Sequence, residues 1–240
     1  MLIPLLSVHN NTFDFTMKKF YFIIFLFLFS LNHSKAQNKK KIYWTYGPEV
    51  IMSFGVLDVD DITMGNIMRF SPVINLEFIG NKDFGDHFGL TFGAAVHNTG
   101  FILNYDDTTL RYKFRTYNIG IPVGFKVGNV NNYYFYAGYE LEFPISYKEK
   151  KYIYMDDSMF TEWFSDRVPA LNHAIYAGFN FGPGMGVKIK YYLNEFFNRD
   201  FVDSDGSMPY KNLKANVVYI SFDFLLFRNN KFVYDTKQKK

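Results

Sequence analysis

Three groups of side chains in this 240-residue chain carry the chemistry of a candidate site. The first combines carboxylates and ammonium groups that occupy alternate positions of otherwise apolar segments. Charges of both signs in a narrow interior can pair, whereas an unpaired charge there would be costly. We therefore predict a polar network that holds a barrel interior rigid, formed by Glu49, Glu77, Glu140, Glu142, Asp223, Lys126, Lys188 and Lys190.

The second group consists of aspartates that cluster between those segments. If the stretches share one rim, their oxygens suit Ca²⁺ or a cation-bridged contact with lipopolysaccharide. Residues 203–206 read Asp-Ser-Asp-Gly, part of a calcium loop, but no bidentate Glu follows, and solvated loop tips explain the clusters as simply. We predict no metal site and no cofactor; the acidic residues are Asp60, Asp61, Asp106, Asp107, Asp156, Asp157, Asp203 and Asp205.

The third group contains the residue types of small lipid-modifying barrels, which use Ser, His and an acid. No nucleophile-elbow motif connects them, and the chain has no phosphate loop, dinucleotide fingerprint or Cys residue. A His on a polar strand face is more typical of a hydrogen-bonded interior residue. We predict no catalytic site and keep a lipid-A-modifying enzyme as the alternative, with His87, His97, His173, Ser53, Ser71 and Ser221 as its candidates.

The elements that position these residues are strands, because period-two alternation dominates the sequence. One face of each segment is apolar and the other is polar. Eight such segments close a small barrel. The sequence thus predicts an all-β, up-and-down antiparallel transmembrane β-barrel of about eight strands, at residues 48–55, 70–79, 88–97, 117–127, 133–146, 175–181, 185–194 and 217–227.

The connections alternate in length. Those at 80–86, 128–132 and 182–184 are short, whereas those at 57–68, 99–110, 147–170 and 196–213 are long. Bacterial outer-membrane barrels have short periplasmic turns and long loops on the outer side. We expect the long connections to face the cell exterior.

Glycine indicates which face points inward. A narrow interior accepts glycine because small residues give bulky neighbours room, whereas a solvated strand face has little reason to accept it. The polar faces carry Gly47, Gly55, Gly89, Gly93, Gly120, Gly124, Gly138, Gly178 and Gly186. We predict a filled interior and an apolar exterior; a soluble barrel with an apolar ligand is the alternative.

Aromatic residues make up 21% of the chain, and some lie near the ends of the predicted strands. They are candidates for interfacial girdles, although aromatic core packing would explain them nearly as well. The candidates are Tyr46, Tyr133, Tyr134, Tyr191, Tyr192 and Trp163.

The N-terminal segment has the pattern of a secretory signal peptide. Two lysines after Met17 precede an apolar run at 20–31, and Ser34-Lys35-Ala36 resembles a cleavage site. A retained membrane anchor is the alternative, although the run is shorter than the ~20 residues that a spanning helix needs. We divide the chain into residues 1–36 (extension and signal peptide), 37–228 (barrel) and 229–240 (basic tail).

The predicted mature chain is nearly neutral. The whole chain carries +3, and residues 1–36 contribute +2 from three lysines and one aspartate, which leaves +1. This charge gives no field for nucleic-acid binding.

The export signal, the eight alternating segments and residues 117–126, Tyr-Asn-Ile-Gly-Ile-Pro-Val-Gly-Phe-Lys, resemble the PorT-like outer-membrane β-barrel family of Bacteroidetes. The resemblance implies a location in the cell outer membrane. Some members of that family take part in secretion and gliding machinery. The expected function is therefore that of a non-enzymatic envelope barrel, with outer-membrane lipid, lipopolysaccharide and other envelope or secretion proteins as expected partners.

Overall fold

The computed structural model describes residues 42–58, 64–105, 110–153, 156–182 and 184–227. They all belong to one compact unit that begins at Lys40. The predicted signal peptide and basic tail lie outside the described residues. In the described part of the chain, no helix has the length and apolarity to span a membrane.

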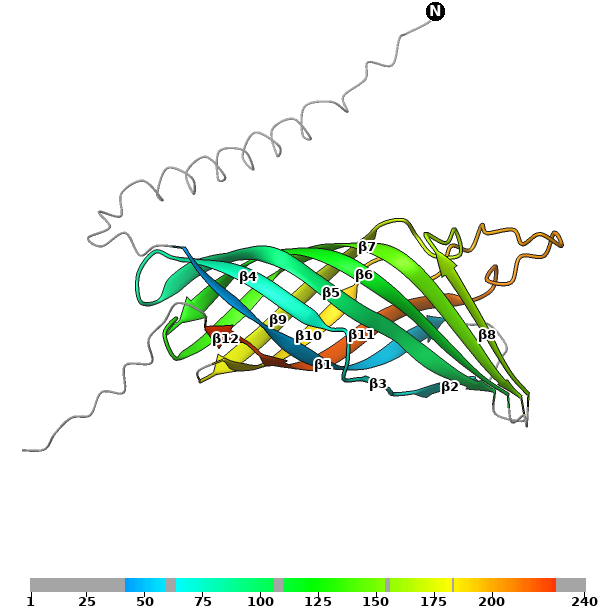
Figure 1. The fold of residues 1–240 in the computed structure, drawn as a ribbon, viewed down its shortest axis with the longest axis horizontal. Coiled ribbons are helices and arrows are strands. Elements are labelled where there is room, and N and C mark those ends of the chain that lie inside the picture. The colour runs from blue at the N-terminus through cyan, green and yellow to red at the C-terminus, as the bar shows by residue number, and fades with distance from the viewer. Residues whose placement is uncertain (1–41, 59–63, 106–109, 154–155, 183, 228–240) are drawn as a thin grey trace, which may run out of the picture. The chain divides into compact units, whose positions relative to one another are not determined.

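The described residues form one antiparallel sheet that curls into a barrel (Figure 1). Its strands are β1 (Tyr43–Asp58), β2 (Met64–Ile67), β3 (Arg69–Ser71), β4 (Leu76–Asp83), β5 (Phe88–Tyr105), β6 (Leu110–Gly128), β7 (Tyr133–Ile153), β8 (Asp156–Trp163), β9 (Asn172–Phe181), β10 (Met185–Tyr192), β11 (Lys214–Phe224) and β12 (Leu226–Phe227).

The ring contains eight strands in the order β1-β4-β5-β6-β7-β9-β10-β11, and β11 pairs with β1 to close it. The closing register runs from Glu49 opposite Asp223 to Asp58 opposite Lys214. The short strands extend this ring: β2 pairs with β5, β3 with β1, and β8 with β7. The predicted eight-stranded, all-β barrel is confirmed.

The strands extend further than predicted at the end with the long connections. β5 continues to Tyr105, β7 to Ile153, and β8 lies within a stretch that we predicted as loop. Beyond the apolar segments the outward positions become charged, so the apolar alternation that marks the strands ends before the strands do. At this end β2, β5, β6, β7 and β8 form a sheet that continues past the ring (Figure 1).

The predicted strand at 70–79 is wrong in one respect, because it is broken between β3 and β4. Pro72 has no amide hydrogen for a strand ladder, and Ile74 has a φ of 61°, which a β-branched residue in a strand does not adopt. The chain therefore leaves the ladder for four residues.

The polar faces point inward. On β6, Gly120, Gly124 and Lys126 lie on the buried side, and the intervening outward positions are exposed and apolar. A methyl group added to Gly120 would overlap the Glu140 carboxylate, and one on Gly138 would overlap the Tyr176 hydroxyl. Glycine thus makes room for interior side chains, as predicted. The outward band on β6 is Ile119, Ile121, Val123, Phe125 and Val127.

The candidates for an interfacial girdle divide between the two faces of the barrel. Tyr46, Tyr133, Tyr191 and Trp163 are exposed. Tyr134 and Tyr192 are buried and face the interior, because each is one residue out of phase with its exposed neighbour along the same strand.

A bulge in β7 changes which residues face inward. The register passes from Asn118 opposite Pro144 to Tyr117 opposite Ser146, so Ile145 has no partner. Before the bulge, even-numbered residues such as Glu142 face the interior. After it, odd-numbered residues do: Tyr147 is fully buried, and Lys148 points outward.

The outward apolar band predicts a strong asymmetry between two substitutions at Val123, in the middle of that band. Val123→Lys would place a charge among acyl chains and lower the free energy of unfolding by ~2–4 kcal/mol, measured by denaturant titration in lipid vesicles. Val123→Leu is the matched control and should retain stability. Equal stability of both variants would contradict an acyl-facing band.

Candidate functional site: the barrel interior

The centre of the interior is braced by an ion-pair cluster that crosses from β10 to β7. Lys190 Nζ lies 2.6 Å from Glu140 Oε2 and 2.6 Å from Glu142 Oε1. Asn118 and Tyr192 also donate hydrogen bonds to Glu142, at 2.7 and 2.8 Å. Because β9 separates β7 from β10 in the ring, these contacts join strands that are not neighbours.

His97 of β5 extends this cluster to β1. Its Nε2 lies 2.9 Å from Glu140 Oε1, and its Nδ1 lies 3.2 Å from Glu49 Oε2. Nε2 is hydrogen-bonded to Glu140, and Nδ1 is in close contact with Glu49. His97 thus connects two glutamates that belong to strands distant in the chain.

A second cation, Lys188, lies at the next inward position of β10. Its Nζ is 3.0 Å from Glu49 Oε1 and 2.5 Å from Glu77 Oε1. Asp223 Oδ1 is 3.8 Å away, and Tyr136 donates a 2.5 Å hydrogen bond to the same carboxylate. Glu49 therefore lies between His97 and Lys188.

A third cation lies toward the end with the short turns. Lys126 Nζ is 2.9 Å from Asp83 Oδ1 and donates to the Tyr43 hydroxyl at 2.6 Å and to Asn81 Oδ1 at 3.0 Å. These contacts join β6 to β4 and β1. Lys126 is fully buried.

The structure thus places all eight predicted interior residues in buried positions and brings each one into contact with a charge of opposite sign. Two further participants, Asp83 and His97, were not predicted. Asp83 was assigned to a turn, although it continues the alternation of Glu77 and Asn81. His97 was considered only as a hydrogen-bonded interior residue, and its two carboxylates come from strands distant in sequence.

Two groups in this interior have the ligand types and spacing of a metal site: Glu49, Glu77 and His97, and His97, Glu140 and Glu142. The carboxylates of both groups contact Lys188 or Lys190 at 2.5 to 3.0 Å. Two ammonium groups already supply the positive charge that a bound ion would bring. The residues fit an ion-pair network better than a metal centre.

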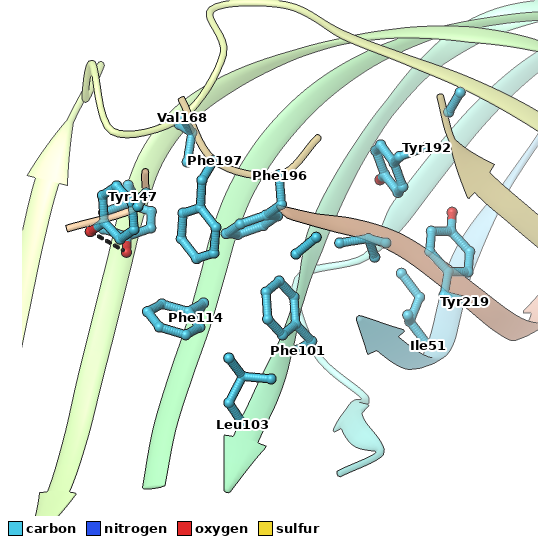
Figure 2. Packing of buried hydrophobic residues seen from close by; sticks show 14 residues of the cluster. Ile51, Phe101, Leu103, Phe114, Tyr147, Val168, Tyr192, Phe196, Phe197 and Tyr219 are labelled. Atoms are coloured by element: carbon cyan, nitrogen blue, oxygen red, sulfur yellow. Dashed lines mark hydrogen bonds between the residues drawn. The ribbon is translucent and has the colours of Figure 1, made fainter. Parts of the chain in front are cut away.

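A cluster of buried, mainly aromatic side chains packs on the side of the long connections (Figure 2). We call this cluster the aromatic plug; it includes Phe101, Phe114, Phe196, Phe197 and Tyr210. Residues 193–213 turn back toward the barrel, and the Phe196 amide donates to the Ala215 carbonyl at 2.7 Å. Phe197 stacks on Tyr210 with ring centroids 4.4 Å apart, and its edge meets Phe101 and Phe114 at 5.9 and 4.9 Å. We predicted residues 196–213 as loop, and alternation carries no signal for such a return.

The predicted acidic cluster is described in part. Asp60, Asp61, Asp106 and Asp107 lie outside the described residues, as do the side chains of Asp156 and Asp157. Asp203 accepts a 2.8 Å hydrogen bond from Arg167, which lowers the pKa of that carboxyl. Asp205 accepts from the Ser207 amide at 2.8 Å. Asp205 thus stabilises its own loop, whereas Asp203 joins this loop to the connection between β8 and β9.

The candidate catalytic residues do not converge. His97 is enclosed by glutamates, His173 bonds to the outward Tyr139 hydroxyl, and His87 lies in an exposed turn. Ser53 donates to the Gly100 carbonyl and Ser221 to Asp223. Within the described ranges, no serine hydroxyl is hydrogen-bonded to a histidine.

A family model described as an outer membrane protein beta-barrel domain matches residues 35–202, well over half of the chain. The chain belongs to this family. The protein is therefore an outer-membrane β-barrel, and its apolar exterior contacts outer-membrane lipid. No curated protein sequence matches this chain significantly.

Solved structures of small outer-membrane proteins are similar at low identity. Ail, the attachment invasion locus protein of Yersinia pestis, is 8% identical with a TM-score of 0.33, over 77% of this chain and 99% of Ail. Neisserial surface protein A is 10% identical with a TM-score of 0.36, over 75% and 96%. The N-terminal β-barrel domain of Pseudomonas aeruginosa OprF is 8% identical with a TM-score of 0.26, over 77% and 100%.

The ion-pair network predicts a large effect of removing its carboxylates. Glu140→Ala together with Glu142→Ala would leave the Lys190 ammonium buried without its two partners. Breaking a buried pair from one side costs ~3–5 kcal/mol, so the melting temperature of the detergent-folded protein should fall by on the order of 10 °C. Adding Lys190→Met should recover part of the loss, because it removes the orphaned cation.

Glu195→Ala is the matched control for this experiment. Its carboxylate pairs with Arg199 at 2.6 Å on the surface, where an ion pair contributes about 0–1 kcal/mol. A double alanine variant that melts at the wild-type temperature would contradict a bracing role for the network.

Proposed function

We propose that this protein is a sealed, non-enzymatic barrel that serves as a structural or accessory component of the outer membrane. The observation that carries the proposal is the double closure of the interior. The ion pairs of Lys188 and Lys190 cross its middle, and the aromatic plug occupies the end with the long connections. Small barrels of eight strands have room for little besides side chains.

The interior does not suit an apolar ligand. A cavity of about 40 Å³ lies between Tyr134, Tyr136, Tyr176 and Lys188. Binding pockets for drug-sized ligands measure roughly 300–1,000 Å³ and are mostly apolar. A space of this size accepts water and excludes an acyl chain, which argues against the soluble, ligand-carrying alternative.

The lipid-modifying alternative has less support than the structural role. His97 is fully buried and is held by Glu49 and Glu140, so a lipid substrate at the barrel exterior would not reach it. Among the described residues, neither His87 nor His173 is hydrogen-bonded to both a serine and a carboxylate.

The part of the sheet that continues past the ring offers a surface for a protein partner in the envelope. In the described part of the chain β8 pairs only with β7, which leaves a strand edge of the kind that extended peptides join. Met159, Trp163 and Phe164 are exposed at or just after this strand. With the PorT-like pattern at residues 117–126, this surface supports a role beside the protein-secretion or gliding machinery.

The sealed interior predicts that the wild-type protein forms no stable ion conductance in planar lipid bilayers. A variant that combines Glu140→Ala, Glu142→Ala, Lys190→Ala and Lys188→Ala with Phe196→Ala and Phe197→Ala removes both ammonium groups of the ion-pair closure and the central rings of the aromatic one, and should conduct. Reproducible conductance steps from the wild-type barrel would contradict the proposal.

The accessory role predicts a secretion defect in a deletion strain, measured as the proteins released into the medium. Wild-type protein should restore release, whereas Met159→Ser with Trp163→Ser should not, because the exposed apolar side chains of β8 are lost. Phe84→Ser, at an exposed turn on the opposite end, is the control and should restore it. Unchanged release from the deletion strain would remove the secretion role and leave the sealed barrel untouched.

A further inference from the structure

The outward faces of β6 and β7 carry a patch of positive charge above the apolar band. On β6, Phe114 and Thr116 are buried, so the alternating odd-numbered residues point outward. On β7 the bulge at Ile145 directs the even-numbered residues outward in the same way. The cationic patch consists of Arg111, Lys113, Arg115, Lys148 and Lys150.

The strand register brings like charges together in this patch. Lys113 lies directly opposite Lys150, and Arg115 lies directly opposite Lys148. Side chains in such cross-strand positions are neighbours on one face, and like charges there destabilise the sheet. The barrel thus carries a surface on which positive charges lie next to one another.

In the described part of the chain, four of the five cations have no carboxylate as a partner. Among the described residues, no carboxylate lies within ion-pair distance of Arg111, Lys113, Arg115 or Lys148. The flanking strands contribute neutral side chains on the same face: Ile102 and Asn104 from β5, and Met159 and Thr161 from β8.

Lys113 lies above the apolar band, and three other cations surround it. Burial lowers the pKa of Lys113, and the positive charges of Arg69, Arg115 and Lys150 lower it further. An anion bound at this surface would relieve the repulsion.

The patch begins where the apolar band ends. On β6 the outward residues change from Ile119 to Tyr117 and then to Arg115. Four residues of strand span about 13 Å, and the strand is tilted, so the cations lie at headgroup depth when the band contacts acyl chains. At this height the outer surface of the barrel is surrounded by lipid headgroups. A lipid headgroup is therefore the anion that lies next to the cationic patch.

We propose that the cationic patch is a binding site for the phosphate groups of lipopolysaccharide in the outer leaflet. The planar guanidinium groups of Arg111 and Arg115 suit bidentate contact with phosphate, and the lysines add compact point charges. The site rests on the sealed barrel proposed above and on the expected orientation of its long connections toward the cell exterior.

The test compares binding of two lipids in detergent by native mass spectrometry. Bis-phosphorylated lipid A should bind the wild-type barrel, and dephosphorylated lipid A with the same acyl chains should bind at least tenfold more weakly. The variant Lys113→Gln, Arg115→Gln and Lys148→Gln should lose at least tenfold in affinity for the phosphorylated lipid. The matched control removes three cations elsewhere, Lys82→Gln, Arg199→Gln and Lys211→Gln, and should bind like the wild type.

A thermal readout separates this site from a merely structural patch. In detergent without lipid A the patch variant should melt at or above the wild-type temperature, because like-charge repulsion is removed. Phosphorylated lipid A should raise the melting temperature of the wild-type protein and leave that of the patch variant unchanged. A patch variant that is less stable in the absence of lipid would indicate a structural role and overturn the proposal.

The remaining outcomes are equally decisive. Equal binding of both lipids by the wild-type protein would show recognition of acyl chains alone. Patch-dependent binding of a soluble sulfated polysaccharide, without binding of lipid A, would assign the surface to another polyanion. The patch variant leaves the interior intact, so it should form no conductance in bilayers. This measurement tests the sealed barrel independently of lipid binding.

Discussion

The structure depends on balancing charge inside a closed ring of strands. Lipid contact requires an apolar side chain at every outward position, so polar groups collect at the alternate, inward ones. A buried carboxylate or ammonium group is tolerated only with a partner. Lys190 with its two glutamates, and Lys188 with Glu49 and Glu77, meet that requirement, while Gly120 and Gly138 make room for them and their neighbours.

Two kinds of packing divide the interior along the barrel. Ion pairs and His97 fill the part surrounded by the apolar band, where rigid bracing joins strands that do not touch. Aromatic rings fill the part beyond it, where β5 and β6 meet a connection that returns to the barrel. Phe197 fits between Tyr210 and Phe114, so the connection between β10 and β11 becomes part of the core. In the described part of the chain it does not pair with the edge of β8.

Alternation and glycine placement predicted the ring, its inward faces and eight of the interior charges, because each property depends on local period. The partners of His97 were not predictable, since Glu49 and Glu140 reach it from strands far apart in the chain. The return of Phe196 and Phe197 was missed for the same reason. Pro72 lacks an amide hydrogen and so indicated the break between β3 and β4. We nevertheless predicted one continuous strand there, because the apolar alternation continues across it.

The unpaired Ile145 makes β7 serve two different environments. Glu140 and Glu142 face inward on one side of it, and Lys148 and Lys150 face outward on the other. A one-residue deletion there would send the lysines into the aromatic cluster and Tyr147 out of it. An insertion or deletion within the strand at this point therefore keeps the inward and outward faces only when it comes in pairs of residues, unless a second irregularity restores the phase.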